Sequence, residues 1–138
     1  MSLEDRSRGF YISALGIAAM VIGSFGPWAK IAVLGASVCG VDGSNDGWGI
    51  LVLALIAGVT LMGGRWLGVA VASVIALAIS YYDRTHVQHV AGKASVLLTV
   101  GWGLNLVLAG AVAMLVGSLM LRSEADYDEK EDAATLHG

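Results

Sequence analysis

The sequence predicts an all-α fold, a bundle of four transmembrane helices with a short β-hairpin-like first outer loop and a disordered acidic C-terminal tail. Two observations predict it. Of the 138 residues, 57% are hydrophobic and only 14% are charged, with a mean hydropathy of +0.74, whereas a soluble domain carries about 25% charged residues. The charged residues are also excluded from long apolar stretches, which leaves most of the chain without a water-compatible surface.

The composition excludes several classes of protein. The low charge content excludes a soluble globule, and the single cysteine excludes a disulfide scaffold. The net charge of −3 excludes a strongly basic nucleic-acid binder. We therefore expect the chain to contact the lipid bilayer and no nucleic acid, as a small multi-pass membrane protein does.

Four stretches without a charged residue account for the predicted helices. They are Tyr11–Ala29, Gly47–Gly64, Trp66–Tyr82 and Ala94–Leu121, with lengths of 19, 18, 17 and 28 residues. A hydrocarbon core about 30 Å thick needs about 20 helical residues. Leu51–Ala57 lacks the apolar–polar alternation of a barrel strand. The predicted helices cover residues 9–29, 48–63, 66–82 and 97–121 of one transmembrane domain, residues 1–122.

The loop after the first helix has the pattern of a β-hairpin. Two short apolar runs, Ile31–Leu34 and Ser37–Val41, flank a turn at Gly35-Ala36. Cys39 lies in the second run. We expect it to be a small buried filler, and an intermolecular disulfide is the alternative.

The hexapeptide that follows resembles the opening of a calcium loop. Asp42, Ser44 and Asp46 place oxygen ligands at positions 1, 3 and 5, and Gly47 stands at position 6. Position 12, where such loops carry a bidentate glutamate, is Leu53. The segment therefore either holds calcium weakly or, as we expect, forms an Asx-turn that caps the second helix.

The second and third helices meet at Gly63–Arg65, a turn so short that they must form an antiparallel hairpin. If the third helix continues past the membrane, Asp83, His86 and His89 follow at i, i+3 and i+6. Carboxylate and imidazole suit zinc, but this spacing does not stack the three side chains well on one face. We expect solvated histidines, and a pH response through the two imidazoles is the functional alternative.

Small residues at helical spacing predict how the bundle packs, because helices in lipid associate through close backbone contact and interhelical hydrogen bonds. The third helix carries such a stripe at Gly68, Ala72, Ala76 and Ser80, and the fourth helix carries one at Ala109, Ala113 and Gly117. We expect both stripes to pack within the chain. Docking to a partner or to a second copy of the chain is the alternative.

Asn105 is the only strongly polar side chain that lies well inside a predicted span. An amide in hydrocarbon needs a hydrogen-bond partner, which we expect to be a serine, a threonine or a backbone carbonyl. A contact to a substrate or an ion is the alternative. No Asp, Glu, Lys, Arg or His lies in the middle of a predicted span, which disfavours an ion-coupled transporter.

Residues 123–138 form the predicted tail, which contains six acidic residues and one Lys or Arg residue, Lys130. Such a segment has little apolar area to bury, so we expect it to be disordered or loosely helical. A solubilising cytoplasmic tail is the expected role, and docking to a basic partner surface is the alternative.

The basic residues of the short loops favour a cytoplasmic N-terminus and a cytoplasmic C-terminus. This orientation puts five of them on the inner side (Arg6, Arg8, Arg65, Arg122 and Lys130) and three on the outer side (Lys30, Arg84 and Lys93). The cell inner membrane is the expected location.

Several motifs together resemble a group of small four-helix membrane proteins that are widespread in actinobacteria and have no assigned function. The motifs are Gly26-Pro27-Trp28-Ala29, Gly40-Val41-Asp42-Gly43, Asp46-Gly47-Trp48 and Val100-Gly101-Trp102-Gly103-Leu104. The resemblance covers roughly residues 10–121 and leaves out the acidic tail. It implies an inner-membrane location and a hairpin-bearing first loop, and it implies no catalytic residue.

The sequence shows no Ser–His–Asp spacing, no phosphate-binding glycine loop and no carboxylate pair at membrane depth. We therefore expect a protein that is not an enzyme and that uses no cofactor. The favoured function is an accessory or scaffold subunit of a larger complex in the cytoplasmic membrane. The alternatives are a self-associating pore similar to a holin and a small transporter.

Overall fold

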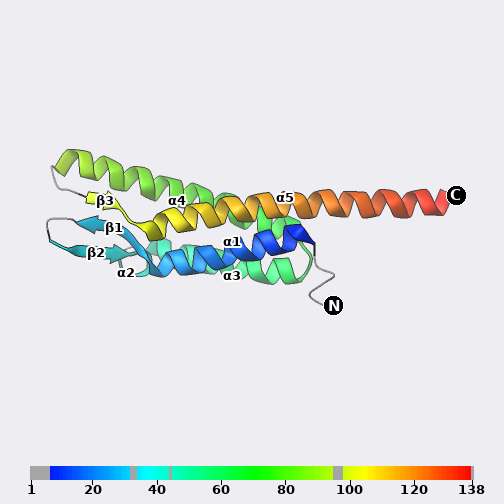
Figure 1. Ribbon diagram of the computed structural model, residues 1–138, viewed down its shortest axis with the longest axis horizontal. Helices are drawn as coiled ribbons and strands as arrows, with labels where there is room; N and C mark the ends of the chain where they lie inside the picture. Colours follow the sequence, from blue (N-terminus) through cyan, green and yellow to red (C-terminus); the bar gives the residue numbers. More distant parts are fainter. Residues whose placement is uncertain (1–6, 32–33, 44, 95–97, 138) are drawn as a thin grey trace.

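Four long helices lie side by side in an up-and-down bundle, with a small β-sheet at one end and a helical extension at the other (Figure 1). The computed structural model describes residues 7–31, 34–43, 45–94 and 98–137. The helices are α1 (Arg8–Phe25), the short α2 (Gly40–Gly43), α3 (Asn45–Met62), α4 (Trp66–Ala94) and α5 (Trp102–His137). The strands are β1 (Pro27–Ile31), β2 (Ala36–Cys39) and β3 (Leu98–Val100). The prediction of a mostly helical fold is confirmed.

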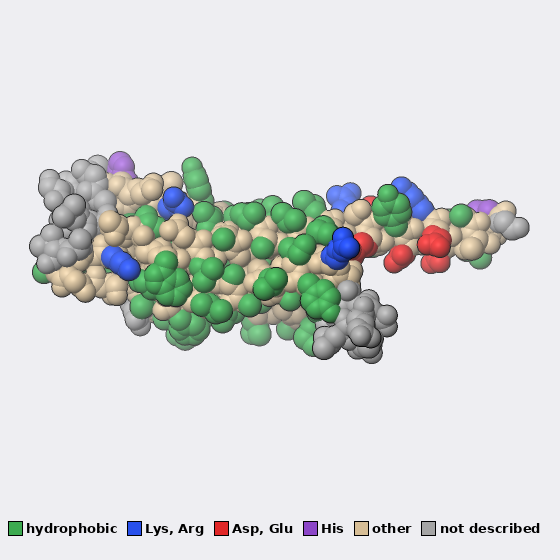
Figure 2. Space-filling model, viewed as in Figure 1, with side chains coloured by type: hydrophobic (Ala, Val, Ile, Leu, Met, Phe, Trp, Pro, Cys, Tyr) green, Lys and Arg blue, Asp and Glu red, His purple; other side chains and the backbone are tan. Residues whose placement is uncertain are grey.

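Within the described part of the chain, three helices are long and apolar enough to cross a membrane. They are Arg8–Phe25, Trp66–His89 and Trp102–His137. The apolar part of α3, Asp46–Met62, is shorter. Large apolar side chains are exposed along the bundle, and Figure 2 shows them over much of its visible face between the two ends. A soluble monomer rarely exposes so extensive an apolar surface.

α1 begins and ends where the local sequence requires. The Ser7 hydroxyl caps its first turn and accepts a hydrogen bond from the Phe10 backbone N–H at 3.3 Å. The helix ends at Phe25 instead of the predicted residue 29, because Pro27 disfavours a helical conformation at Gly26. The residues from Pro27 onward therefore continue as β1.

The predicted hairpin is present, although its strands are shifted from the predicted apolar runs. β1 pairs antiparallel with β2, so that Ile31 lies opposite Ala36. Gly35, in the turn, adopts a φ of +61°, which glycine accepts without strain. A third strand, β3, pairs antiparallel with the other edge of β1. The sequence places these residues in the fourth helix, but that helix begins only at Trp102.

The turn between α3 and α4 closes the end of α3 with backbone hydrogen bonds. The Arg65 N–H donates to the Thr60 carbonyl oxygen at 2.9 Å, and the Gly64 N–H donates to the Leu61 carbonyl oxygen at 3.1 Å. Gly64 has a φ of +70°, as is usual for a glycine just past a helix end. The two helices run antiparallel, as the sequence predicts (Figure 1).

α4 and α5 both continue past their predicted ends. α4 reaches Ala94, because no glycine or proline interrupts the chain between Gly68 and Gly92. α5 reaches His137, so the tail, which the sequence predicts to be disordered or loosely helical, is helical in its described residues. No glycine or proline lies between Gly117 and Gly138, and a helix that has already formed adds residues at little cost.

Glycines spaced seven residues apart bring α1 and α5 into close contact. The facing pairs are Gly9 and Gly117, Gly16 and Gly110, and Gly23 and Gly103, all buried. A Cβ atom on Gly16 would lie 2.5 Å from the Gly110 carbonyl oxygen and 2.7 Å from the Met114 backbone nitrogen. Glycine is therefore required for this backbone approach, which is a typical way for helices to pack in lipid.

The two predicted small-residue stripes differ in where they lie. On α4, Ala72, Ala76 and Ser80 are buried, and Gly68 contacts Thr60 of α3. On α5, Gly117 is buried, but Ala113 is half-buried and Ala109 is exposed. The expected packing of Ala109 within the chain is thus not observed. The face of α5 that packs on α1 carries glycines spaced seven residues apart, and Ala109 does not lie on it.

Candidate functional site

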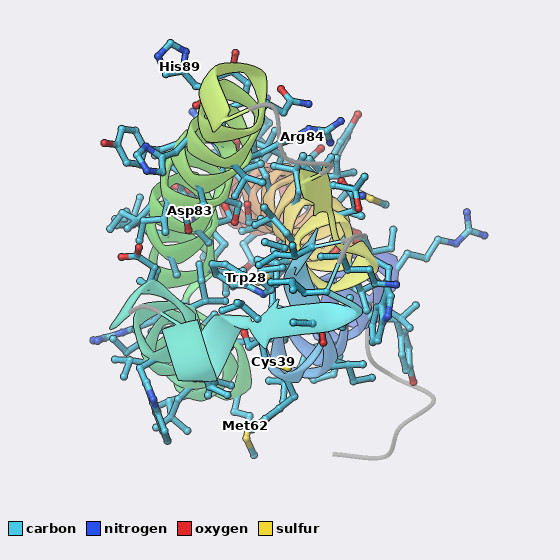
Figure 3. The ribbon with its side chains drawn as sticks, turned by 90° about the vertical axis from the view of Figure 1, so that its left-hand side faces the viewer. Trp28, Cys39, Met62, Asp83, Arg84 and His89 are labelled. Carbon is cyan, nitrogen blue, oxygen red and sulfur yellow. The ribbon has the colours of Figure 1, made fainter. Side chains whose placement is uncertain are left out.

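A pocket of about 420 Å³ lies at the end of the bundle that carries the sheet, and we call it the sheet-end pocket. Its lining residues are Trp28, Ala29, Val38 and Cys39 from the sheet, Asp46 from α3, and Tyr82, Asp83, His86 and Val87 from α4. Figure 3 views the molecule from this end and shows Trp28 and Asp83 between α4 and the sheet. Because four elements contribute, no single stretch of sequence encodes the pocket.

Trp28 fixes the sheet against the end of α1. Its side chain is only 6% exposed, and its Nε1–H donates a hydrogen bond to the Gly23 carbonyl oxygen at 3.0 Å. Gly40 packs directly on the indole, since a Cβ atom there would lie 2.5 Å from Nε1. A buried indole that is both packed and hydrogen-bonded holds one wall of the pocket in place.

Asp46 and Asp83 bring two carboxyl groups to the pocket from different helices. The two groups interact electrostatically, and His86 acts on Asp83 from one turn further along α4. Asp83 Oδ2 is buried and has no hydrogen-bond partner among the described residues. Two neighbouring carboxylates repel one another, which favours a cationic group between them. Trp28 and Tyr82 add aromatic side chains to the lining of the pocket.

The two histidines of α4 differ in their surroundings. The His86 ring stacks on Tyr82, with centroids 6.1 Å apart and an interplanar angle of 19°. His89 is exposed and projects away from the sheet-end pocket (Figure 3). Over the described ranges, no three His, Cys, Asp or Glu side chains are grouped so that they could hold a metal ion. Asp83, His86 and His89 are therefore not grouped as metal ligands in the described structure.

The residues of the calcium-loop pattern are only partly within the described structure. Asp46 lies in the first turn of α3, where the helix dipole favours a carboxylate, and it lines the sheet-end pocket. Asp42 belongs to α2, and Ser44 lies outside the described residues. Cys39 is a half-buried free thiol in the wall of the pocket.

Asn105 lies near the same end of the bundle and not deep within a span. Its Oδ1 accepts a hydrogen bond from Arg84 Nη1 at 2.9 Å, and its side chain is exposed. The expected serine, threonine or backbone partner is therefore replaced by an arginine. The difference arises because α5 begins at Trp102 and not at residue 97, which puts Asn105 in the first turn of the helix.

Sequence reasoning misses the pairing of Asp46 with Asp83. It assigns each aspartate to a separate candidate metal set, and it names Trp28 only within the motif Gly26-Pro27-Trp28-Ala29 and Tyr82 only as the end of an apolar stretch. One signal was available: both aspartates stand at the same predicted side of the membrane, each next to an apolar stretch. Their contact itself depends on how α3, α4 and the sheet meet.

The chain was compared with protein families, curated proteins and solved structures, and no match was found in any of the three. We therefore infer the function from the geometry of the chain's own residues.

Proposed function

We propose that this chain is a small, non-enzymatic integral membrane protein that serves as an accessory or scaffold subunit of a larger complex in the cell inner membrane. Three helices long and apolar enough to cross a membrane, together with the exposed apolar side chains of α3, support insertion of all four helices. The resemblance to small actinobacterial four-helix membrane proteins supports the same location.

The distribution of arginines supports an orientation with both termini in the cytoplasm. Arg65 lies in the α3–α4 turn, and the Arg122 guanidinium lies 5.3 Å from the centroid of the adjacent Trp66 ring. Arg8 precedes Gly9, which packs against Leu121 of α5. These three arginines therefore stand at the end opposite the sheet, and the positive-inside rule assigns that end to the cytoplasm.

The observation that carries the proposed role is the projecting end of α5. From Ser123 to His137 the helix extends beyond the other helices, and nearly all of its residues are exposed (Figure 1). It presents six acidic side chains and Lys130. A helical segment of this length gains little stability in isolation, so contact with a partner would stabilise it. Its acidic side chains suit a partner with a basic surface.

Removal of the acidic charges tests this role. The variant replaces all six acids by amides: Glu124→Gln, Asp126→Asn, Asp128→Asn, Glu129→Gln, Glu131→Gln and Asp132→Asn. The control variant, Ala133→Gln with Ala134→Gln, changes the same helix without changing its charge. We expect a stoichiometric partner to remain bound to the native protein and to the control in mild detergent, and to be lost from the amide variant.

Two outcomes would contradict the proposal. A species that contains one copy of this chain and nothing else, extracted from its native membrane, would exclude a subunit role. A homo-oligomer that causes dye leakage from cells would support the self-associating pore instead.

Orientation is tested separately with single cysteines. Ser37→Cys on β2 and Ser123→Cys on α5 are placed in turn in a Cys39→Ser background, since both serines are exposed. A membrane-impermeant maleimide added to intact cells should label position 37 and leave position 123 unlabelled. The reverse pattern would invert the proposed topology, and release of the protein by alkaline carbonate would exclude insertion.

A further inference from the structure

A groove of about 580 Å³ runs between α3 and α4, next to the turn that joins them, and we call it the hairpin groove. Leu53 and Ile56 of α3 and Val71 and Ile75 of α4 form its walls, and Arg65 lies at its end. The ten residues of α4 from Trp66 to Ile75 span about 15 Å of helix. This length is half of a hydrocarbon core about 30 Å thick, so the groove fits one leaflet of a bilayer.

Small residues on α4 create the depth of the groove. Gly68 and Ala72 line it, and a Cβ atom on Gly68 would lie 2.7 Å from the Thr60 Cβ atom. The Thr60 hydroxyl donates to the carbonyl oxygens of Ile56 and Ala57, at 2.9 and 3.0 Å, so its proton is already used. The interior of the groove between Ile75 and the turn is therefore predominantly apolar.

The end of the groove at the turn is positively charged. Arg65 lines the groove and is exposed, and no carboxylate in the described residues forms an ion pair with it. Arg122 contacts Trp66, the residue after Arg65, but neither the Arg122 nor the Trp66 side chain lines the groove. The groove thus combines an apolar channel one leaflet long with a guanidinium at its mouth.

We propose that the hairpin groove binds an anionic glycerophospholipid, with one acyl chain between α3 and α4 and the phosphate against Arg65. A guanidinium donates two parallel hydrogen bonds to a phosphate. Basic pockets between transmembrane helices on the cytoplasmic side are also suited to anionic head groups. This inference rests on the proposed membrane insertion and orientation, which put Arg65 at the cytoplasmic surface.

A transmembrane helix of another protein fits the groove less well. Such a helix is about 10–12 Å wide with its side chains, and helices in lipid associate through small residues and shared hydrogen bonds. The walls of the hairpin groove are branched aliphatic side chains, and its one hydroxyl is bonded within α3. An acyl chain needs neither small residues nor a hydrogen-bond donor along its length.

Native mass spectrometry of the detergent-purified full chain tests this proposal. Dioleoyl phosphatidylglycerol is compared with dioleoyl phosphatidylcholine, which has the same acyl chains and phosphate but a zwitterionic choline head group in place of an anionic glycerol one. We expect one phosphatidylglycerol site that is at least about tenfold tighter than the phosphatidylcholine site, the equivalent of one charge-assisted contact. Arg65→Gln should remove this preference. Arg8→Gln, a basic residue at the same end but outside the groove, should leave it unchanged.

A second pair of variants tests the acyl-chain channel. Val71→Trp fills the groove and should weaken binding of both lipids, whereas Val74→Trp should leave binding unchanged. Val71 and Val74 are 52% and 54% exposed, so both variants should fold, but only Val71 lines the groove. A photoreactive residue at position 71 in native membranes should label phospholipid.

Three results would overturn the lipid site. They are equal affinity for the two lipids, unchanged phosphatidylglycerol binding in Arg65→Gln and Val71→Trp, and labelling of a protein helix in place of phospholipid. Because binding is measured on purified protein, such a failure is distinguishable from a failure of the carbonate or cysteine-labelling experiments, which test insertion and topology.

Discussion

Arg84 and Asn105 join α4 to α5 through a side-chain hydrogen bond of 2.9 Å from Nη1 to Oδ1, one turn into α5. The bond links two residues that are 21 positions apart in sequence, on helices that run antiparallel. It lies at the sheet end of the bundle, close to the sheet-end pocket, since Arg84 follows Asp83. Asn105 therefore acts at the boundary of the apolar bundle and not within it.

Asn105→Leu should reduce stability only modestly, because the hydrogen bond is exposed. We expect a loss of about 0.5–1 kcal/mol in the free energy of unfolding, typical of one interhelical hydrogen bond. Arg84→Gln should cost a similar amount, and a double-mutant cycle measured by thermal unfolding in detergent should show that the two losses are not additive. Full additivity would mean that the two side chains do not interact.

Gly16→Ala should destabilise the bundle strongly. The added methyl group would meet backbone atoms of Gly110 and Met114, which cannot move independently of α5. We expect a loss of about 1–3 kcal/mol, the usual cost of overpacking. Gly58→Ala is the matched control, because nothing lies within 4 Å of the added atom. It should be neutral or should stabilise α3 by up to about 1 kcal/mol. Equal effects of the two substitutions would argue against the α1–α5 glycine contact.

Trp28→Phe should loosen the sheet. It removes the hydrogen bond to the Gly23 carbonyl oxygen and leaves that buried group with the Gly26 N–H, at 3.1 Å, as its remaining donor. We expect a loss of about 1–2 kcal/mol in stability. Trp48→Phe, at a residue that is 59% exposed, should change stability by less than about 0.5 kcal/mol. A Trp28→Phe protein as stable as the native one would show that the indole hydrogen bond contributes nothing.

Asp83→Asn should increase stability at neutral pH. The substitution removes the repulsion between Asp83 and Asp46 and keeps the shape of the side chain. We expect a gain of about 0.5–1 kcal/mol, reduced by the partial exposure of the pair. Asp46→Asn should give a similar gain, and the double variant should gain little more than either single one. A loss of stability in both single variants would indicate that the native pair is held by a bound cation.

The main helices of this fold could be predicted from sequence, because exclusion of charge over 17 to 28 residues is a strong and local signal. The Gly63–Arg65 hairpin could also be predicted, since its length leaves one arrangement. Helix ends were less predictable. Pro27 ends α1 early, and β3 takes residues from the apolar stretch that precedes α5. That strand forms only because β1 offers it a free edge, which is a property of the folded chain.

The packing surfaces show a similar limit. A search for small residues four positions apart finds Ala72 and Ala76 on α4, but on α5 it selects Ala109, which is exposed. The glycines at positions 103, 110 and 117 recur every seven residues, and so do those at positions 9, 16 and 23. The match between the two series identifies the contact, but it becomes visible only when α1 and α5 are considered together.

α5 is one uninterrupted helix of 36 residues, with a length of about 54 Å. Its glycines fit against α1 without altering its course, and its first residue follows Gly101, whose N–H is bonded to the Trp28 carbonyl oxygen at 2.7 Å. The acidic tip is therefore connected to the sheet through a single continuous helix. A displacement of the tip would reach the opposite end of the molecule without crossing a loop within α5.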